Sequence, residues 1–109
     1  MATTISKGRD GWDAETVIDL ETKNRVLIIT THKVNGGVAN RATVNTKKDG
    51  FLSWDLFGDF SKRTVFKGTR CTEKTVRALH QQALDAVEQI KAEAAAFYQV
   101  KDAKEVVSA

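Results

Sequence analysis

The sequence contains no proline and a single cysteine among its 109 residues. The lack of proline leaves the fold class open. A single cysteine excludes a disulfide within the chain and is typical of proteins from a reducing compartment. No apolar run approaches the length of about 20 residues that crosses a bilayer, and residues 1–7 lack the apolar core of a secretory signal. We therefore expect a cytoplasmic protein with no membrane segment.

Residues that could carry catalysis or bind a metal are also scarce. His32 and His80 have no Cys, Asp or Glu at the spacing of a metal site, and we interpret them as surface or interface residues. Cys71 precedes a predicted helix without an identifiable base. Asp55 and Asp59 are four residues apart across a strand end, which gives no defined geometry for acid–base chemistry. We predict no catalytic residue, metal or cofactor, and hence a protein that is not an enzyme.

The first half of the chain has the pattern of short strands. Apolar and polar residues alternate over 12–20, and residues 25–34 are rich in β-branched side chains. Asn35-Gly36-Gly37 is a strong hairpin signal. The further strands are predicted at 38–46 and 51–57, with a turn at 47–50 between them. The unbroken apolar run Val26–Ile29 indicates a strand that is covered on both faces or crosses the centre of the sheet.

The second half is predicted to be helical after a loop over 58–71, in which residues 64–67 have the pattern of a short strand. Thr72 is the expected N-cap, and Cys71 and Val76 occupy the positions of a hydrophobic staple. Apolar residues then recur at alternating spacings of three and four, as in one face of a helix over 72–98. They are Val76, Leu79, Ala83, Val87, Ile90, Ala94 and Phe97.

These patterns predict an α+β fold, in which an antiparallel four- to five-stranded meander sheet is followed by one long C-terminal helix. Residues 1–11 are expected to form a flexible N-terminal arm, 12–98 a single domain and 99–109 a frayed tail. The predicted helix is about 40 Å long, which is longer than four strands can cover. We therefore expect a homodimer whose interface contains Val87, Ile90, Ala94 and Phe97.

The charge of the chain is concentrated in its middle. Residues 22–80 hold twelve Lys and Arg and four Asp and Glu, a balance of +8, whereas residues 1–21 carry −3 and residues 81–109 carry −2. The same middle segment contains four of the five phenylalanines and one of the two tryptophans. Cations suit phosphates, and aromatic rings stack on unpaired bases. The pattern therefore favours a protein that binds single-stranded nucleic acid, with DNA favoured over RNA.

The expected contacts divide into two groups. The predicted phosphate contacts are Lys33, Arg41, Lys47, Lys48, Lys62, Arg63 and Lys67. The predicted stacking residues are Phe51, Trp54 and Phe57, and alternation along the strand leaves open which of its faces is exposed. Arg70, Lys74 and Arg77 continue the basic cluster into the helix, where positive charge opposes the helix dipole.

One family shares these local features. Trp54-Asp55-Leu56-Phe57, followed by Lys67-Gly68-Thr69-Arg70-Cys71-Thr72-Glu73 at the helix start, resembles the whirly-type fold of the positive-cofactor-four family. That family consists of single-stranded DNA-binding coactivators and their bacterial and phage relatives. The resemblance covers roughly residues 13–90. It implies a homodimer joined through its helices, with curved sheets whose basic and aromatic residues hold an unpaired strand.

Two alternatives stay open at this point. The chain could be a protein-interaction or assembly module that uses a sheet edge and the long helix, with the basic middle conferring solubility. It could also form a cup for a small ligand between sheet and helix, which an apolar cavity would reveal.

Overall fold

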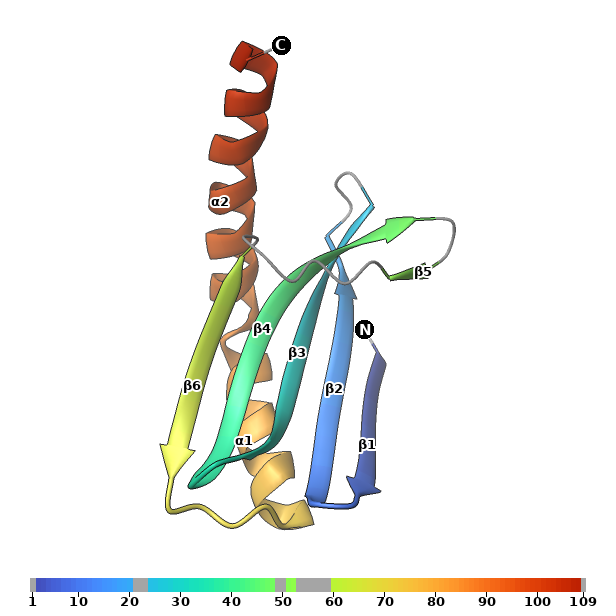
Figure 1. Ribbon diagram of the computed structural model, residues 1–109, viewed down its shortest axis with the longest axis vertical. Helices are drawn as coiled ribbons and strands as arrows, with labels where there is room; N and C mark the ends of the chain where they lie inside the picture. Colours follow the sequence, from blue (N-terminus) through green and yellow to red (C-terminus); the bar gives the residue numbers. More distant parts are fainter. Residues whose placement is uncertain (1, 21–23, 49–50, 53–59, 109) are drawn as a thin grey trace.

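The computed structural model describes residues 2–20, 24–48, 51–52 and 60–108 of the chain. Six strands precede two helices (Figure 1). The strands are β1 (Ala2–Gly8), β2 (Gly11–Asp19), β3 (Arg25–Val34), β4 (Gly37–Lys48), β5 (Phe51–Leu52) and β6 (Ser61–Lys67). The helices are α1 (Glu73–Asp85) and α2 (Val87–Ser108). An α+β fold with an antiparallel sheet is thereby confirmed.

The sheet follows the order of the chain from β1 to β4, with every neighbouring pair antiparallel. Two strands then pair with β4 at different places. β6 lies along Gly37–Thr43, whereas the short β5 pairs only with Lys47 and Lys48. The predicted strand over 25–34 coincides with β3, and the Asn35-Gly36 turn joins β3 to β4 as expected. The predicted burial of Val26–Ile29 is also confirmed, since all four residues are buried.

Both helices pack on the same face of the sheet, behind it in the view of Figure 1. Alternate residues of β2, β3 and β4 meet them there. The core cluster consists of Ile18, Leu27, Ile29, Ala42, Val44, Ala83, Ile90, Ala94 and Tyr98. Thr72 caps α1 as predicted, because its side chain accepts a hydrogen bond from the Thr75 backbone N–H.

The single long helix of the prediction is two helices in the structure. The chain leaves helical geometry at Ala86, whose N–H bonds back to the carbonyls of Ala83 and Gln82. Beyond this break the buried positions recur every four residues, at Ile90, Ala94 and Tyr98. The buried aromatic residue is therefore Tyr98, whereas the neighbouring Phe97 is 39% exposed.

The two ends of the chain differ from the prediction. Residues 2–8, expected in a flexible arm, form β1 and pair with β2 along their whole length. A side-chain hydrogen bond of 2.7 Å between Thr3 and Thr16 supports this edge strand. The expected frayed tail is the continuation of α2 to Ser108. Arg25 holds this part of the helix through two hydrogen bonds to Asp102, and its guanidinium lies 3.9 Å from the centre of the Tyr98 ring.

The neighbour of β4 also differs from the prediction. The expected strand over 51–57 is described only at Phe51–Leu52, and residues 53–59 lie outside the described part of the chain. The main partner is β6, in a segment predicted as mostly loop. Gly37 allows this pairing, because a Cβ atom there would lie 2.1 Å from the Phe66 carbonyl oxygen. Neither helix, over the residues that are described, has the length and apolar character needed to cross a membrane.

Candidate nucleic-acid interface

The side of the sheet away from α1 and α2, here called the open face, carries the candidate interface. In an antiparallel sheet, residues directly opposite each other point to the same side. Thr16 and Thr31 contact α1 through His80, so the residues that alternate with them face the other way. Toward the β3–β4 turn the open face carries polar and charged residues together with Val34, Ala39 and Val65, and Val26 and Ile28 farther along β3 are buried.

Two arginines form the centre of a basic region. Arg41 of β4 and Arg63 of β6 are directly opposite each other in the register, and both are exposed. Lys67 lies farther along β6, on the same side of the register and also exposed. Arg41, Arg63 and Lys67 are here called the basic half of the open face. None of the three forms an ion pair with another described residue.

The opposite half of the same face is acidic. Asp13, Glu15 and Asp19 alternate along β2, are exposed and point away from the helices. The register places Glu15 opposite Thr4 of β1 and Thr30 of β3. Asp13 and Glu15 help to line a surface depression of about 410 Å³ with the side chains of Ser6 and His32. The open face is therefore divided between acids on β2 and bases on β4 and β6, with β3 between them.

His32 of β3 lies on the boundary between these two halves. Partial burial lowers the pKa of its imidazole, and the nearby Arg63 and Arg41 lower it further, while Asp13 raises it. The pKa of His32 is therefore affected by charges from both halves of the open face. Neutralisation of Arg63 and Arg41 would therefore raise the pKa of His32.

The predicted phosphate contacts do not share one side of the sheet. Lys62 is adjacent to Arg63 in sequence but faces the helices, where its Nζ lies 3.0 Å from the Glu93 carboxylate of α2. Lys33 is exposed at the end of β3 and alternates to the helix-facing side. Lys47 and Lys48 belong to the far end of β4, beside Phe51 of β5. Of the predicted phosphate contacts, the register places Arg41, Arg63 and Lys67 on one face.

The predicted stacking residues belong largely to an undescribed segment. Trp54 and Phe57 lie outside the described residues, and Phe51 is described only as part of β5. Trp12 of β2 and Phe66 of β6 alternate to the helix-facing side. Base stacking on Phe51, Trp54 and Phe57 stays a prediction.

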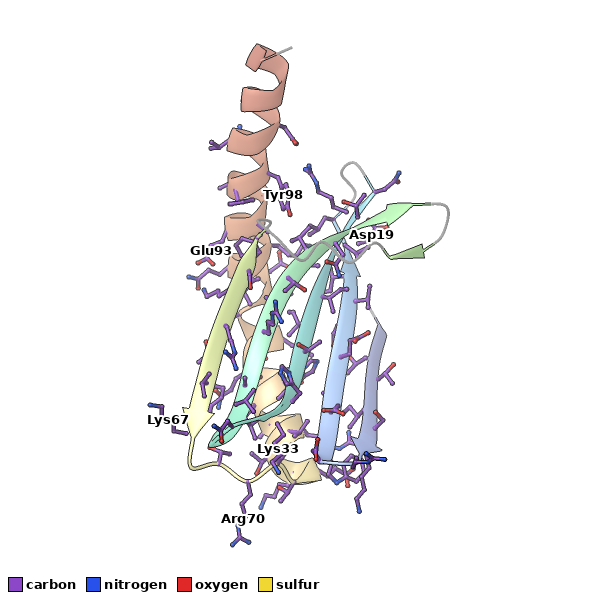
Figure 2. The ribbon with its side chains drawn as sticks, viewed as in Figure 1. Asp19, Lys33, Lys67, Arg70, Glu93 and Tyr98 are labelled. Atoms are coloured by element: carbon purple, nitrogen blue, oxygen red, sulfur yellow. The ribbon has the colours of Figure 1, made fainter. Side chains whose placement is uncertain are left out.

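A second basic group extends the interface past the end of the sheet. Figure 2 shows Lys33, Lys67 and Arg70 at the same end of the molecule, next to the start of α1, and all three are exposed. The positive charge of Arg77 at this helix start is balanced by Glu73, one turn earlier and 3.0 Å away. We call Lys33, Lys67 and Arg70 the basic end.

The predicted dimer interface is mostly occupied within the chain. Ile90 and Ala94 are buried in the core cluster, and Val87 packs against it. Phe97 is the exception, since it stays partly exposed while its ring makes edge contacts with Phe60 and Tyr98. A dimer would therefore need surface other than Val87, Ile90 and Ala94.

The histidine interpreted as a surface or interface residue, His80, is 2% exposed and lies inside a hydrogen-bond chain. Thr31 donates to the Asn40 side-chain oxygen, and Asn40 donates to the Leu79 carbonyl. Since the Thr31 hydrogen is used, His80 Nδ1–H donates to Thr31 Oγ1 at 2.8 Å. Nε2 is then the acceptor for the Thr16 hydroxyl at 2.7 Å. Burial lowers the pKa of the His80 imidazole, which favours this neutral form.

This hydrogen-bond chain could not be found from periodicity. His80 falls next to Leu79 on the apolar side of α1, and its two ring partners come from β2 and β3. The alternation of threonine with apolar residues on those strands was the available signal. The arrangement joins α1 to the sheet and has no access to solvent through His80, so we interpret it as structural.

The remaining chemical candidates give no site. Cys71 is half-buried, and its Sγ donates to the Trp12 carbonyl at 3.1 Å. Its contacts with Gly11 join the start of α1 to the start of β2. Among the residues that the structure describes, no group of three or more His, Cys, Asp and Glu lies close enough to hold a metal ion.

Two hollows separate parts of the sheet from the helices. One of about 290 Å³ lies beside β6 and includes Phe66 and Lys62 in its lining. The other, of about 630 Å³, lies along α2 and is lined by the Arg25–Asp102 ion pair, Glu88, Lys91 and several alanines. Ligand pockets are usually lined mainly by apolar and aromatic groups. The larger hollow is lined by Leu20 and Tyr98 as well as by these charged residues, and a cup for a small ligand stays a prediction.

Comparison with protein-family models, curated protein sequences and solved structures gives no match.

Proposed function

We propose that this protein is a non-enzymatic, cytoplasmic binder of single-stranded nucleic acid, and that the basic half of its open face holds the phosphates. The observation that carries the proposal is the direct opposition of Arg41 and Arg63 on neighbouring strands. Like charges in this position destabilise a sheet. A bound anion would turn that cost into a favourable interaction, since guanidinium groups bind phosphate oxygens with paired hydrogen bonds.

The surroundings of the two arginines suit an extended backbone. Lys67 is four residues from Arg63 along β6, which corresponds to about 13 Å along a strand. The basic end then continues the positive charge past β6 to Arg70, and Lys33 adds a charge at the same end of the molecule from the helix-facing side of β3. Hydroxyl groups of Thr30 and Ser61 on the same face add neutral partners for phosphate or sugar. A single strand following β6 would meet Ser61, Arg63 and Lys67 in succession, and Arg70 lies beyond the end of β6.

The test is a fluorescence titration with a labelled oligonucleotide at two salt concentrations. Wild-type protein should bind, and its affinity should fall as salt rises. Arg41→Gln/Arg63→Gln should bind more weakly and reduce the magnitude of the logarithmic salt slope by about 1.4, which is the contribution of two phosphates on a single strand.

Lys7→Gln/Lys91→Gln provides a matched control, because it removes two positive charges from outside the interface. It should change the affinity and the salt slope much less. Absence of binding at low salt, or an affinity that does not change with salt concentration, would exclude the proposal.

A protein-assembly role is the second candidate, and the exposed end of α2 favours it. The helix continues well past the sheet (Figure 1), and Phe97 and Val100 are 39% and 58% exposed there. We propose that the chain forms a homodimer through these residues. Sedimentation of wild type and Val100→Glu tests this, since only a dimer through α2 would be weakened by the new charge.

A further inference from the structure

We propose that Asp13 and Glu15 are specificity residues that admit a single strand to the open face and reject a duplex. The inference rests on the proposed function and adds the reason why one backbone fits and two do not. It draws on the division of the open face into an acidic and a basic half.

The spacing of the strands sets the geometry. Glu15, Thr30 and Arg41 are connected through consecutive register pairs across β2, β3 and β4. Neighbouring strands are about 4.8 Å apart, so Glu15 lies about 10 Å across the sheet from Arg41. Arg63 is one strand farther away on β6. A backbone held between Arg41 and Arg63 is therefore separated from the acids by the width of β3.

The second backbone of a duplex would reach the acids. The grooves of B-form DNA are about 6 Å and about 12 Å wide. Suppose that a duplex lies on the open face with one backbone bound to Arg41 and Arg63. Its other backbone would then lie over β2 and β3. There its phosphates would face Asp13 and Glu15. A single strand has no second backbone and avoids this repulsion.

The two carboxylates are suited to this role. Both are exposed, and neither forms an ion pair within the described residues. An ionised carboxylate has acceptor oxygens and no hydrogen to donate to phosphate. A phosphate resting on the face over β2 would lie closer to these carboxylates than the Debye length of about 8 Å at physiological salt, so screening would not remove the repulsion.

The experiment compares single-stranded and duplex oligonucleotides of the same length with wild type and Asp13→Asn/Glu15→Gln. We expect wild type to prefer the single strand. In the variant the preference should shrink about tenfold, mainly through tighter duplex binding, because two carboxylates no longer face the second backbone.

The matched control is Asp85→Asn/Glu88→Gln, which removes two exposed acids from the helices on the other side of the sheet. It should strengthen binding of both oligonucleotides to a similar, smaller degree. An unchanged preference in Asp13→Asn/Glu15→Gln, or an equal change in the control, would overturn the inference and leave the proposed function standing. If wild type binds neither oligonucleotide at low salt, the proposed function fails, and the inference with it.

Discussion

His80 Nε2 lies 2.7 Å from Thr16 Oγ1 in the layer between α1 and the sheet, and this contact continues through the imidazole to Thr31. The helix is therefore held to the sheet by directed hydrogen bonds as well as by apolar packing. Buried polar groups of this kind are costly to leave without their partners. The network makes His80 a sensitive position for stability.

Replacing His80 with alanine should lower the free energy of unfolding by about 3 kcal/mol. The substitution leaves a cavity and removes a partner from both Thr16 and Thr31. Urea unfolding measures the loss. His32→Ala is the control, because that ring is only partly buried on the open face, and it should cost less than about 1 kcal/mol. Equal losses in the two variants would contradict a structural role for His80.

Stability should also fall as the pH drops below the ordinary histidine pKa of 6.5. Burial lowers the pKa of His80 in the folded state, so the unfolded chain takes up the proton first. The contribution is complete above the unfolded-state pKa and is lost as the pH falls toward the folded-state pKa. The pKa of His32 is lowered too and acts in the same direction.

The two histidines can be separated by comparing variants. Urea midpoints at about pH 7.5 and about pH 5.5 should differ in His32→Gln, where His80 remains. The difference should largely vanish in His32→Gln/His80→Gln. A pH response of the same size in both variants would assign it to other groups.

Gly37→Ala should disrupt the pairing of β4 with β6. The new Cβ atom would lie 2.1 Å from the Phe66 carbonyl oxygen, so the strands must separate locally. We expect a loss of about 2–3 kcal/mol and faster amide hydrogen exchange along β6. Gly68→Ala is the control, because Gly68 has a φ of +76° and open space around it. It should cost about 1 kcal/mol from backbone strain alone. Unchanged exchange along β6 in Gly37→Ala would contradict this pairing.

Binding of nucleic acid should be tighter at lower pH because of His32. A phosphate on Arg41 and Arg63 offsets two charges that lower the pKa of His32, so binding raises that pKa and takes up a proton. We expect affinity to rise about threefold or more from about pH 7.5 to about pH 6. His32→Gln should remove most of this increase while retaining binding. A variant with the wild-type pH response would disprove the linkage.

Several elements could be predicted because their local signals agree. β3 combines a run of β-branched and apolar residues with an Asn-Gly turn, and its predicted and observed bounds coincide. Thr72 caps α1 because its short hydroxyl side chain reaches the free N–H of Thr75. Alternation on β2 placed Ala14, Thr16 and Ile18 on the buried side.

The edge strands β1 and β6 had weak strand patterns in the sequence, because they bury little apolar surface. β1 has one half-buried apolar side chain among its described residues, Ile5, and its strand state depends on pairing with β2. β6 has five exposed residues at its start. The position of the second helix could not be predicted either, because the break at Ala86 lies within a continuous helical pattern.

The candidate interface could be predicted only in part from the sequence, for a related reason. The basic middle segment was visible in the composition, but the side of the sheet on which each residue falls depends on the register. Lys62 and Arg63 are consecutive, yet one pairs with Glu93 and the other lies on the open face. The acids of β2 were counted as part of an acidic end of the chain. Their position beside the basic half required the folded sheet.

The separation of charge across the open face also has a consequence for how the protein meets a partner. Acids on β2 and bases on β4 and β6 give the face an electric dipole that acts before any contact is made. Near a polyanion, the field would turn the molecule so that β6 approaches first and β2 trails. Steering of this kind raises the association rate constant and weakens as salt is added. The same side chains that determine where a strand lies would then also determine how quickly it is captured.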